Sequence, residues 1–590
     1  MTSIQQQTVP PVAQPIPRQD VIHGETRTDS YFWLRDKANP KVIEYLEAEN
    51  RYTETLMRQT EKLQADLYKE LVGRIKQTDL TVPERQNGYY YYSRTEEGKQ
   101  YTIYCRKKGD LSAPEEILVD QNALAEKSAY FRVGAYRVSP NQRYLAYSVD
   151  TDGSEIYTIY LKDLQNGELM ADRITNAYGY ALDWANDDRT LFYVTQDSAK
   201  RPYRVYRHTL GSTQADGLLF EEKDELFFVF LEKTRSKTYL LIGSESKITS
   251  EVRYLSADTP TGEFEVFHPR KPGVKYSVDH RADKFYILTD EDAKNSKLME
   301  VSVSSPARQN WQEIIAHQNT IKLDGIDLFK DHLVVYERED GLKNIRIVHL
   351  ADSKVHRVSF PEPVYTFVPN RNPEFDTSTL RFTYDSLVTP DAVTDYDMNA
   401  RTNEVKKREE VKGYDPSLYQ SERTHATAPD GTRVPISLVY KKGIARDGSN
   451  PLYLYAYGSY GASMDPSFAA NRLSLLDRGF IFAIAHIRGG GEMGKAWYED
   501  GKLLKKKNTF TDYIASAEHL IAQKYTSAGK LVASGGSAGG LLMGAVVNMR
   551  PDLFKAVVAK VPFVDVINTM LDPSIPLTVT EYEEWGNPSD

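Results

Sequence analysis

The sequence predicts a β-propeller followed by an α/β domain, on the basis of three observations. A chain of 590 residues is too long for one hydrophobic core, because single cores rarely grow past about 300 residues. Short alternating apolar runs separated by turn clusters fill about 80 to 411, and strands that alternate with helices follow. We therefore expect, in chain order, a flexible leader over 1–20, a helical segment over 21–78, the propeller over 79–411 and the α/β domain over 412–590.

The composition is typical of an ordinary globular protein, with 40% hydrophobic and 27% charged residues. The net charge of −9 disfavours binding to the phosphates of nucleic acids. The single cysteine, Cys105, permits no intramolecular disulfide and contributes no metal cluster. We expect no metal, no cofactor and no nucleic-acid partner.

The N-terminal segment predicts a leader and then helices. The leader is rich in Pro and Gln and lacks the apolar core of a signal peptide. No window along the chain approaches about 18 uninterrupted apolar residues, so we expect a cytoplasmic protein without a membrane segment. Apolar residues at helical spacing then predict helices over roughly 40–75, namely Ile43, Leu46, Leu63, Leu67 and Leu71.

The propeller is predicted from a repeat. Seven similar strands, among them NGYYYYSR, DRTLFYVT and DHLVVYER, have centres near 91, 147, 193, 241, 287, 335 and 383. This spacing is the period of a four-stranded blade, so we expect seven blades. The alternative is an irregular pair of β-sandwiches.

The last third predicts an α/β sheet. PLYLYAYGSYG and GFIFAIAHIRGGG are apolar runs that end in glycine, FTDYIASAEHLIAQKY has the spacing of an amphipathic helix, and KLVASGGSAGGLLMGAVVNMR reads as strand, turn and helix. Strands alternating with helices are the pattern of an α/β fold.

A candidate nucleophile lies in the last of these stretches. Gly535, Ser537 and Gly539 form a G-x-S-x-G turn between an apolar strand and a helix of small residues. The glycines permit a tight elbow, and the helix N-terminus presents free N–H groups to a developing negative charge. The alternative is a tight turn without chemistry.

A second glycine-rich stretch, RGGGEMG, matches the G-x-G-x-x-G pattern of dinucleotide sites through Gly489, Gly491 and Gly494. It is followed by the charged and aromatic segment KAWYEDGKLLKKKN instead of an apolar helix. We therefore predict a structural loop and not a dinucleotide site.

Four stretches resemble the prolyl oligopeptidase family: YGSYGASMD, HIRGGGEMGKAWYEDGKLLKKKNTFTDYIASAEHLI, GGSAGGLLMGAVVNMRPDLFKAVVAKVPFVD and EYEEWGNP. The last is similar to the oligopeptidase B branch, and the resemblance runs from about DSYFWLRD to the end of the sequence. It implies a seven-bladed β-propeller capping an α/β-hydrolase domain, to which the N-terminal helical segment belongs. It also implies a serine peptidase that acts on short peptides without a cofactor.

The resemblance assigns catalytic roles to three residues. Ser537 is the nucleophile, and the hydroxyl of Tyr457 joins the backbone N–H of Ala538 in an oxyanion hole. The alternative for Tyr457 is a core tyrosine, since the chain contains 40 tyrosines.

The resemblance also implies a pocket for basic side chains. Glu581 and Glu583 match the acidic pair that confers a preference for Arg or Lys before the scissile bond, because carboxylates bind a guanidinium through charged hydrogen bonds. Asp465 matches a second acidic subsite, although Ser467 stands where another carboxylate is expected. The alternative for the glutamates is a solvated acidic loop.

The general base is missing from the expected place. His425, His486 and His519 are the histidines of 412–590, and none follows Ser537. The resemblance implies the chain order Ser, Asp and His, with Asp and His beyond EEWGNP. We therefore expect a sequence truncated at its C-terminus, a hydrolase sheet with an unpaired apolar edge, and a chain that is inactive or nearly so.

The function expected from these observations is cleavage of short basic peptides after Arg or Lys by Ser-His-Asp acyl transfer. One alternative is an inactive propeller and hydrolase remnant that binds cationic peptides, and another is a prolyl-specific oligopeptidase. A non-peptide esterase is disfavoured by the propeller and by Glu581 with Glu583. The sequence carries no indication of the oligomeric state.

Overall fold

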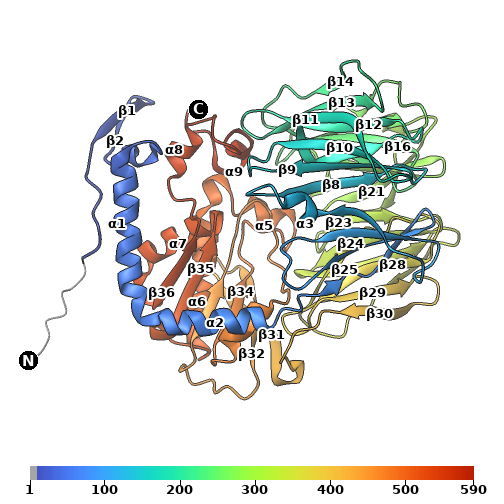
Figure 1. Cartoon of the computed structure of the whole chain (residues 1–590). Coiled ribbons are helices and arrows are strands. Elements are labelled where there is room, and N and C mark those ends of the chain that lie inside the picture. Colours follow the sequence, from blue (N-terminus) through green and yellow to red (C-terminus); the bar gives the residue numbers. More distant parts are fainter. Residues whose placement is uncertain (1–8) are drawn as a thin grey trace, which may run out of the picture. The chain divides into compact units, whose positions relative to one another are not determined.

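The computed structural model describes residues 9–590 (Figure 1). The chain divides into two compact units, one formed by the residues up to Ile75 with Asn587–Asp590 and the other by Lys76–Gly586. The first eight residues of the expected leader lie outside the described residues.

The smaller unit contains a β-hairpin and two helices. β1 (Arg18–Ile22) pairs antiparallel with β2 (Glu25–Asp29), so regular structure begins inside the segment expected to be a flexible leader. α1 (Pro40–Met57) starts after Asn39, whose side chain accepts a hydrogen bond from the Lys41 N–H at 3.1 Å. Together with α2 (Glu61–Gly73), it confirms the helices predicted from the helical spacing of apolar residues.

The larger unit opens with antiparallel sheets that form the blades of a propeller (Figure 1). The first blade contains β3 (Asp79–Leu80), β4 (Glu84–Gln86), β5 (Tyr89–Thr95), β6 (Ile103–Lys108) and β7 (Glu116–Asp120), and α3 (Gln121–Ala125) follows it. Four further blades each contain four strands. Two of them consist of β15 (Phe228–Lys233), β16 (Tyr239–Glu245), β17 (Ser250–Ser256) and β18 (Glu265–His268), and of β19 (Tyr276–Arg281), β20 (Lys284–Thr289), β21 (Lys297–Ser302) and β22 (Gln312–Ile315). The other two consist of β23 (Ile321–Leu328), β24 (His332–Glu339), β25 (Leu342–His349) and β26 (Lys354–Arg357), and of β27 (Thr366–Pro369), β28 (Thr379–Asp385), β29 (Ala392–Asp397) and β30 (Thr402–Arg408).

The remaining two blades share one strand. A seven-stranded sheet contains β8 (Arg132–Val138), β9 (Tyr144–Asp150), β10 (Tyr157–Asp163), β11 (Leu169–Trp184), β12 (Thr190–Gln196), β13 (Pro202–Thr209) and β14 (Gly217–Glu221). The first half of β11 pairs with β10 as far as Ala177, and its second half pairs with β12 from there on. Gly179 is needed beyond this point, because a Cβ would lie 2.5 Å from the Tyr157 ring. The described strands thus form seven blades, which confirms the propeller and makes the β-sandwich alternative wrong.

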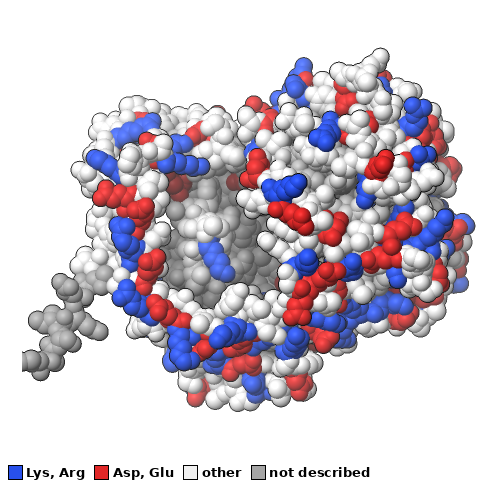
Figure 2. Space-filling model, viewed as in Figure 1, with Lys and Arg blue, Asp and Glu red and all other residues white. Residues whose placement is uncertain are grey.

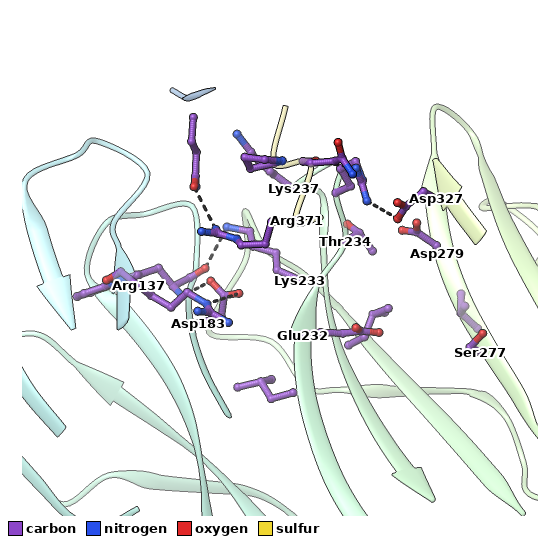
Figure 3. A pocket seen from close by; sticks show the side chains of 18 of the residues that line it. Arg137, Asp183, Glu232, Lys233, Thr234, Lys237, Ser277, Asp279, Asp327 and Arg371 are labelled. Atoms are coloured by element: carbon purple, nitrogen blue, oxygen red, sulfur yellow. Dashed lines mark hydrogen bonds and ion pairs between the residues drawn. The ribbon is translucent and has the colours of Figure 1, made fainter. Parts of the chain in front are cut away.

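The blades surround a polar cavity of about 550 Å³ (Figure 3). Side chains of both signs line it, including Arg137, Asp183, Glu232, Lys233, Asp279, Asp327 and Arg371. Two basic residues between β15 and β16 bond to the last and first blades: an Nη1 of Arg235 donates to the Asn372 carbonyl and the Nζ of Lys237 donates to Asn87, each at 2.6 Å. On the propeller surface in view, basic and acidic side chains likewise intermingle (Figure 2).

The α/β domain is built on a six-stranded sheet in the order β31-β32-β34-β33-β35-β36. Its strands are β31 (Tyr419–Thr427), β32 (Arg433–Lys441), β33 (Leu452–Tyr455), β34 (Ile481–Ala485), β35 (Leu531–Gly536) and β36 (Ala556–Lys560). β32 runs antiparallel to both neighbours, whereas β34, β33, β35 and β36 are parallel. Parallel strands end at the same edge of a sheet, so the segments after β33 and β35 lie side by side. β36 is an outer strand and leaves Val557 exposed.

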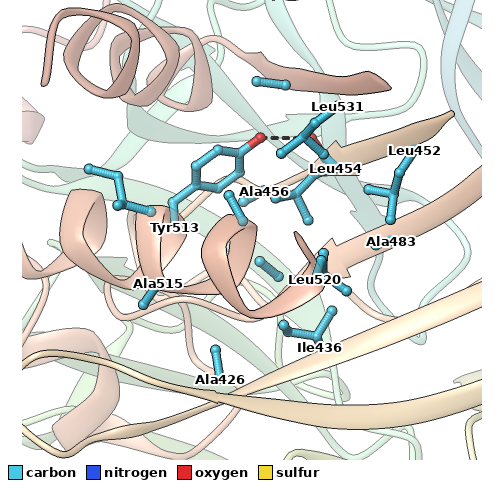
Figure 4. Close-up of a cluster of buried hydrophobic side chains, with 14 of the residues drawn as sticks. Ala426, Ile436, Leu452, Leu454, Ala456, Ala483, Tyr513, Ala515, Leu520 and Leu531 are labelled. Carbon is cyan, nitrogen blue, oxygen red and sulfur yellow. Dashed lines mark hydrogen bonds between the residues drawn. The ribbon is translucent and has the colours of Figure 1, made fainter. Parts of the chain in front are cut away.

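The core of this domain lies between the sheet and its helices (Figure 4). The helices are α4 (Leu473–Leu476), α5 (Lys495–Glu499), α6 (Lys507–Ala522), α7 (Ala538–Met549), α8 (Val566–Met570) and α9 (Tyr582–Trp585). Tyr513 of α6 is fully buried among aliphatic side chains such as Leu454 and Leu531, and its hydroxyl donates to the Leu454 carbonyl at 2.9 Å. This bond satisfies a polar group that would otherwise be costly to bury.

One buried carboxyl predicts a pH-dependent stability. Asp385 of β28 accepts a hydrogen bond from the Phe468 N–H at 2.7 Å. Burial raises its pKa from 3.8 to about 7, although the Phe468 N–H opposes the rise. Between pH 3.8 and about 7, Asp385 is therefore protonated in the folded protein and ionised in the unfolded chain. The free energy of unfolding consequently falls as the pH rises through this range.

Replacement of Asp385 with asparagine keeps the acceptor and removes the titration. We expect the variant to gain about 2 kcal/mol relative to the parent as the pH is raised from about 5 to about 8. Thermal unfolding of both proteins across this range measures the difference. The exposed Asp376→Asn change is the control and should show no trend, whereas a constant difference for Asp385→Asn would contradict the assignment.

Candidate active site

Ser537 lies on a strained turn between β35 and α7. Its backbone has φ 53° and ψ −119°, a conformation that costs energy for any residue with a Cβ. The Ser537 N–H donates to the Lys560 carbonyl at 2.9 Å, and its carbonyl accepts from the N–H groups of Gly540 and Phe563. These bonds fix the turn while the serine itself remains exposed at the carboxyl edge of the sheet.

The glycines around Ser537 are required by close backbone contacts. A Cβ on Gly535 would lie 2.2 Å from the Gly539 carbonyl oxygen, and one on Gly539 would lie 2.9 Å from that of Ala456. A Cβ on Gly540 would lie 2.5 Å from Pro562. The predicted tight elbow is therefore present, and each of these glycines permits a close approach of another part of the chain.

The two predicted oxyanion donors lie beside this turn. Tyr457 follows β33, the neighbour of β35 in the sheet. Burial raises the pKa of Tyr457, the nearby Ser537 side chain opposes the rise, and the charge of Glu581 adds to it. Ala538 is the first residue of α7, where a backbone N–H has no partner within the helix. The structure thus brings Tyr457, Ser537 and Ala538 together.

The structure places the two predicted specificity glutamates against different partners. Oε2 of Glu581 accepts hydrogen bonds from the Tyr460 hydroxyl at 2.9 Å and from Trp585 Nε1 at 3.0 Å. Oε2 of Glu583 instead accepts from the backbone N–H of Ile248, a propeller residue, at 3.2 Å. Glu581 is buried and Glu583 is half-buried.

A third glutamate, which the sequence analysis missed, is more deeply buried than either. Glu584 is fully buried and accepts from the Tyr498 hydroxyl at 2.6 Å and from the Tyr460 N–H at 3.0 Å. Burial lowers the pKa of the nearby Lys506 to about 8, and the charge of Glu584 opposes the shift. Glu583 and Glu584 are adjacent in the stretch EYEEW. Nothing in this stretch indicates which of the two side chains is buried.

Asp465 is already engaged by the propeller. Its Oδ1 lies 2.9 Å from Nη1 of Arg338, and its Oδ2 lies 2.6 Å from Nζ of Lys343. Burial acts to raise the pKa of Asp465, but these two cations outweigh it and hold the pKa below its usual value. A basic substrate group at this subsite has to compete with both.

Two of the three histidines of 412–590 have partners away from Ser537. Nε2 of His486 bonds the Ser437 hydroxyl on β32 at 2.7 Å, and Nε2 of His519 bonds Thr424 on β31 at 3.0 Å. His425 lies on β31 itself. His486 directly follows β34, which is two strand spacings, about 10 Å, from β35. In this part of the described chain, no histidine ring is hydrogen-bonded to Ser537.

The backbone of the glycine-rich loop after β34 packs against the backbone of the loop that follows β33. A Cβ on Gly489 would lie 2.1 Å from the Gly458 carbonyl oxygen, and one on Gly491 would lie 2.3 Å from that of Gly461. The loop leads only into the five-residue α5. At its start, Nε and Nη2 of Arg488 bond the two carboxylate oxygens of buried Asp512 on α6 at 2.9 and 2.6 Å.

Within residues 9–590, no cluster of three or more His, Cys, Asp or Glu side chains is arranged to hold a metal ion. Likewise, none of the described helices has the length and apolar character that crossing a membrane requires.

Comparison with known proteins identifies the family. The N-terminal β-propeller domain of prolyl oligopeptidase matches residues 10–409, and the prolyl oligopeptidase family matches residues 466–590. Dipeptidyl aminopeptidase BI of Pseudoxanthomonas mexicana is 44% identical, over 96% of this chain and 81% of that protein. Protease 2 of Moraxella lacunata is 42% identical, over 98% and 84%.

A solved structure agrees with the fold. Oligopeptidase B from Trypanosoma brucei, in its closed form with covalently bound antipain, superimposes with a TM-score of 0.92 at 38% identity, over 98% of this chain and 86% of that one. The chain is thus similar to oligopeptidase B in sequence and in structure, and it belongs to the prolyl oligopeptidase family of serine peptidases.

Proposed function

We propose that the protein is a serine oligopeptidase that cleaves short peptides on the carboxyl side of arginine or lysine. The observation that carries the proposal is the strained elbow that holds Ser537 at the edge of the sheet beside Tyr457. Ser537 Oγ attacks the peptide carbonyl, while the Tyr457 hydroxyl and the Ala538 N–H stabilise the oxyanion. The amine leaves with a proton, and water then hydrolyses the acyl-enzyme.

The preference for a basic side chain is supported by Glu581 and its aromatic surroundings. The Trp585 ring centroid lies 5.9 Å from that of Tyr460 and 5.3 Å from that of Phe563. Such rings attract cations through their faces, and a carboxylate bonded to two of them adds charged hydrogen bonds. The two hydrogen bonds accepted by Oε2 of Glu581 orient this carboxylate, and Oε1 accepts none from the described residues.

The reaction also requires a base that takes the proton of Ser537. His425 lies on β31, and the rings of His486 and His519 bond Ser437 on β32 and Thr424 on β31, two strands that are not adjacent to β35. We therefore propose that none of these three histidines is the base that activates Ser537.

The specificity is tested by Glu581→Gln, in a form of the protein with measurable activity. Glutamine keeps an acceptor for Tyr460 and Trp585 but loses the charge, so kcat/KM for an arginyl amide should fall about tenfold or more, or ~1.4 kcal/mol, with little change for a phenylalanyl amide. Glu583→Gln is the second variant, and the exposed Glu518→Gln on α6 is the charge-matched control. An unchanged ratio of arginyl to phenylalanyl cleavage in both pocket variants would place the specificity elsewhere.

A second candidate activity is release of dipeptides from a free N-terminus. It is favoured by the 44% identity to dipeptidyl aminopeptidase BI. The same assay separates the two, because an arginyl dipeptide amide can be supplied with either a free or an acylated N-terminus. Cleavage of both forms at similar rates supports the endopeptidase, whereas loss of cleavage on acylation supports dipeptide release.

A further inference from the structure

A short propeller loop contacts the group of residues proposed to bind the basic side chain. Residues 246–249 join β16 to β17, and the Ser246 N–H donates to the Thr249 carbonyl at 2.8 Å. The Ser246 hydroxyl accepts from the N–H groups of Ile248 and Thr249 at 3.3 and 3.1 Å. The loop is therefore held in one shape by its own hydrogen bonds.

Two of its residues reach the acidic pocket. The Ile248 N–H donates to Oε2 of Glu583 at 3.2 Å. The Nζ of Lys247 lies 5.0 Å from the ring centroid of Tyr460, within the range of a cation–π interaction. The hydroxyl of that same tyrosine donates to Glu581. A cation from the propeller therefore occupies the aromatic face next to the predicted specificity carboxylate.

The charges around Lys247 distinguish it from its neighbours. It lines a cavity of about 500 Å³ between the propeller and the α/β domain. Four other lysines of this cavity are paired with carboxylates at 2.5 to 3.0 Å: Lys275 with Glu245, Lys294 with Glu499, Lys322 with Asp324 and Lys495 with Asp290. Lys502 donates to the Tyr498 hydroxyl and the Glu583 carbonyl. Among the described lysines of this cavity, Lys247 alone has neither an ion pair nor a side-chain hydrogen bond, and its Nζ contacts only the ring of Tyr460.

We propose that Lys247 is a specificity-determining residue that competes with the basic side chain of the substrate for the Tyr460 face and the adjoining carboxylates, an inference that rests on the function proposed above. Lys247 is half-buried and carries no ion pair among the described residues, so it can be displaced. The loop that carries it forms the propeller side of the pocket through the Ile248 N–H.

The test is peptide binding to Ser537→Ala, which needs no catalysis. Fluorescence anisotropy compares two labelled peptides that differ only in arginine or norleucine at the position before the scissile bond. Lys247→Met should tighten binding of the arginine peptide about fivefold, because a like charge is removed from its site, and should leave the norleucine peptide unchanged. Lys247→Arg keeps the cation and should bind as the parent does. Lys354→Met, at an exposed site on β26, controls for net charge.

Arginine binding that is unchanged or weaker in Lys247→Met would overturn the inference, as would equal tightening of both peptides. Glu581→Gln in the same background separates this failure from that of the proposed function. If Glu581→Gln does not weaken the arginine peptide, the proposed specificity itself is wrong. If it does weaken that peptide but Lys247→Met has no effect, only the role of Lys247 is overturned.

Discussion

Replacing Ser537 with alanine is expected to lower kcat/KM for an arginyl amide at least about 1000-fold in any form of the protein with measurable activity. The change removes the attacking oxygen and leaves only the stabilisation supplied by the oxyanion donors and by substrate binding. Alanine also keeps the Cβ of serine, so it adds no new contact at the elbow. The measurement is the initial rate on one fluorogenic substrate.

Ser534 provides a matched control three residues earlier on β35. It is buried, and its hydroxyl accepts a hydrogen bond from Tyr453 at 2.6 Å. Ser534→Ala removes that bond and should cost about 1 kcal/mol of stability, with kcat/KM nearly unchanged. Equal losses of activity in the two variants would show that Ser537 matters for folding and not for chemistry.

Asp512→Ala is expected to lower the free energy of unfolding by about 3 to 5 kcal/mol, because it leaves the buried guanidinium of Arg488 without its main partner. Both side chains are nearly inaccessible to solvent. The Arg488 N–H also donates to Oδ2 of Asp512 at 3.0 Å, so the loss extends to the backbone of the glycine-rich loop. Urea unfolding with an unchanged m-value measures the effect.

A double variant tests the cause. Arg488→Leu combined with Asp512→Leu removes both charges, and it should be more stable than Asp512→Ala because no buried charge is left unpaired. Asp430, which bonds the remaining guanidinium nitrogen at 2.6 Å, is half-exposed and tolerates the loss of its partner. A double variant less stable than the single one would mean that packing, and not charge, controls this contact.

The propeller and the turn at Ser537 were predictable because their signals are local. Blade length fixes a repeat of about fifty residues, and the elbow needs glycine where a Cβ would strike the backbone four residues away or a segment that follows a neighbouring strand. These constraints leave marks in a single sequence. The shared strand β11 left none, because its two halves each look like an ordinary blade strand.

The surroundings of the acidic residues could not be predicted, since they depend on contacts across hundreds of positions. Glu583 bonds a residue 335 positions earlier. Asp465 is held by Arg338 and Lys343 of the propeller, a contact that no local pattern announces. The inward position of Glu584 likewise depends on Tyr498 and Tyr460, which reach it from other loops. The sequence shows where the acidic residues lie along the chain, but their hydrogen-bond and ion-pair partners depend on the tertiary packing.

The continuity of β11 also limits how this propeller can change its number of repeats. Most neighbouring blades are joined by a connecting segment, so a duplication or deletion cut at such a segment adds or removes a whole sheet. No such cut exists between the second and third blades, because β11 supplies a strand to each. A genetic exchange with its boundary inside Leu169–Trp184 would leave one sheet without an edge. A duplication or deletion that preserves complete sheets would therefore have to include both of these blades together.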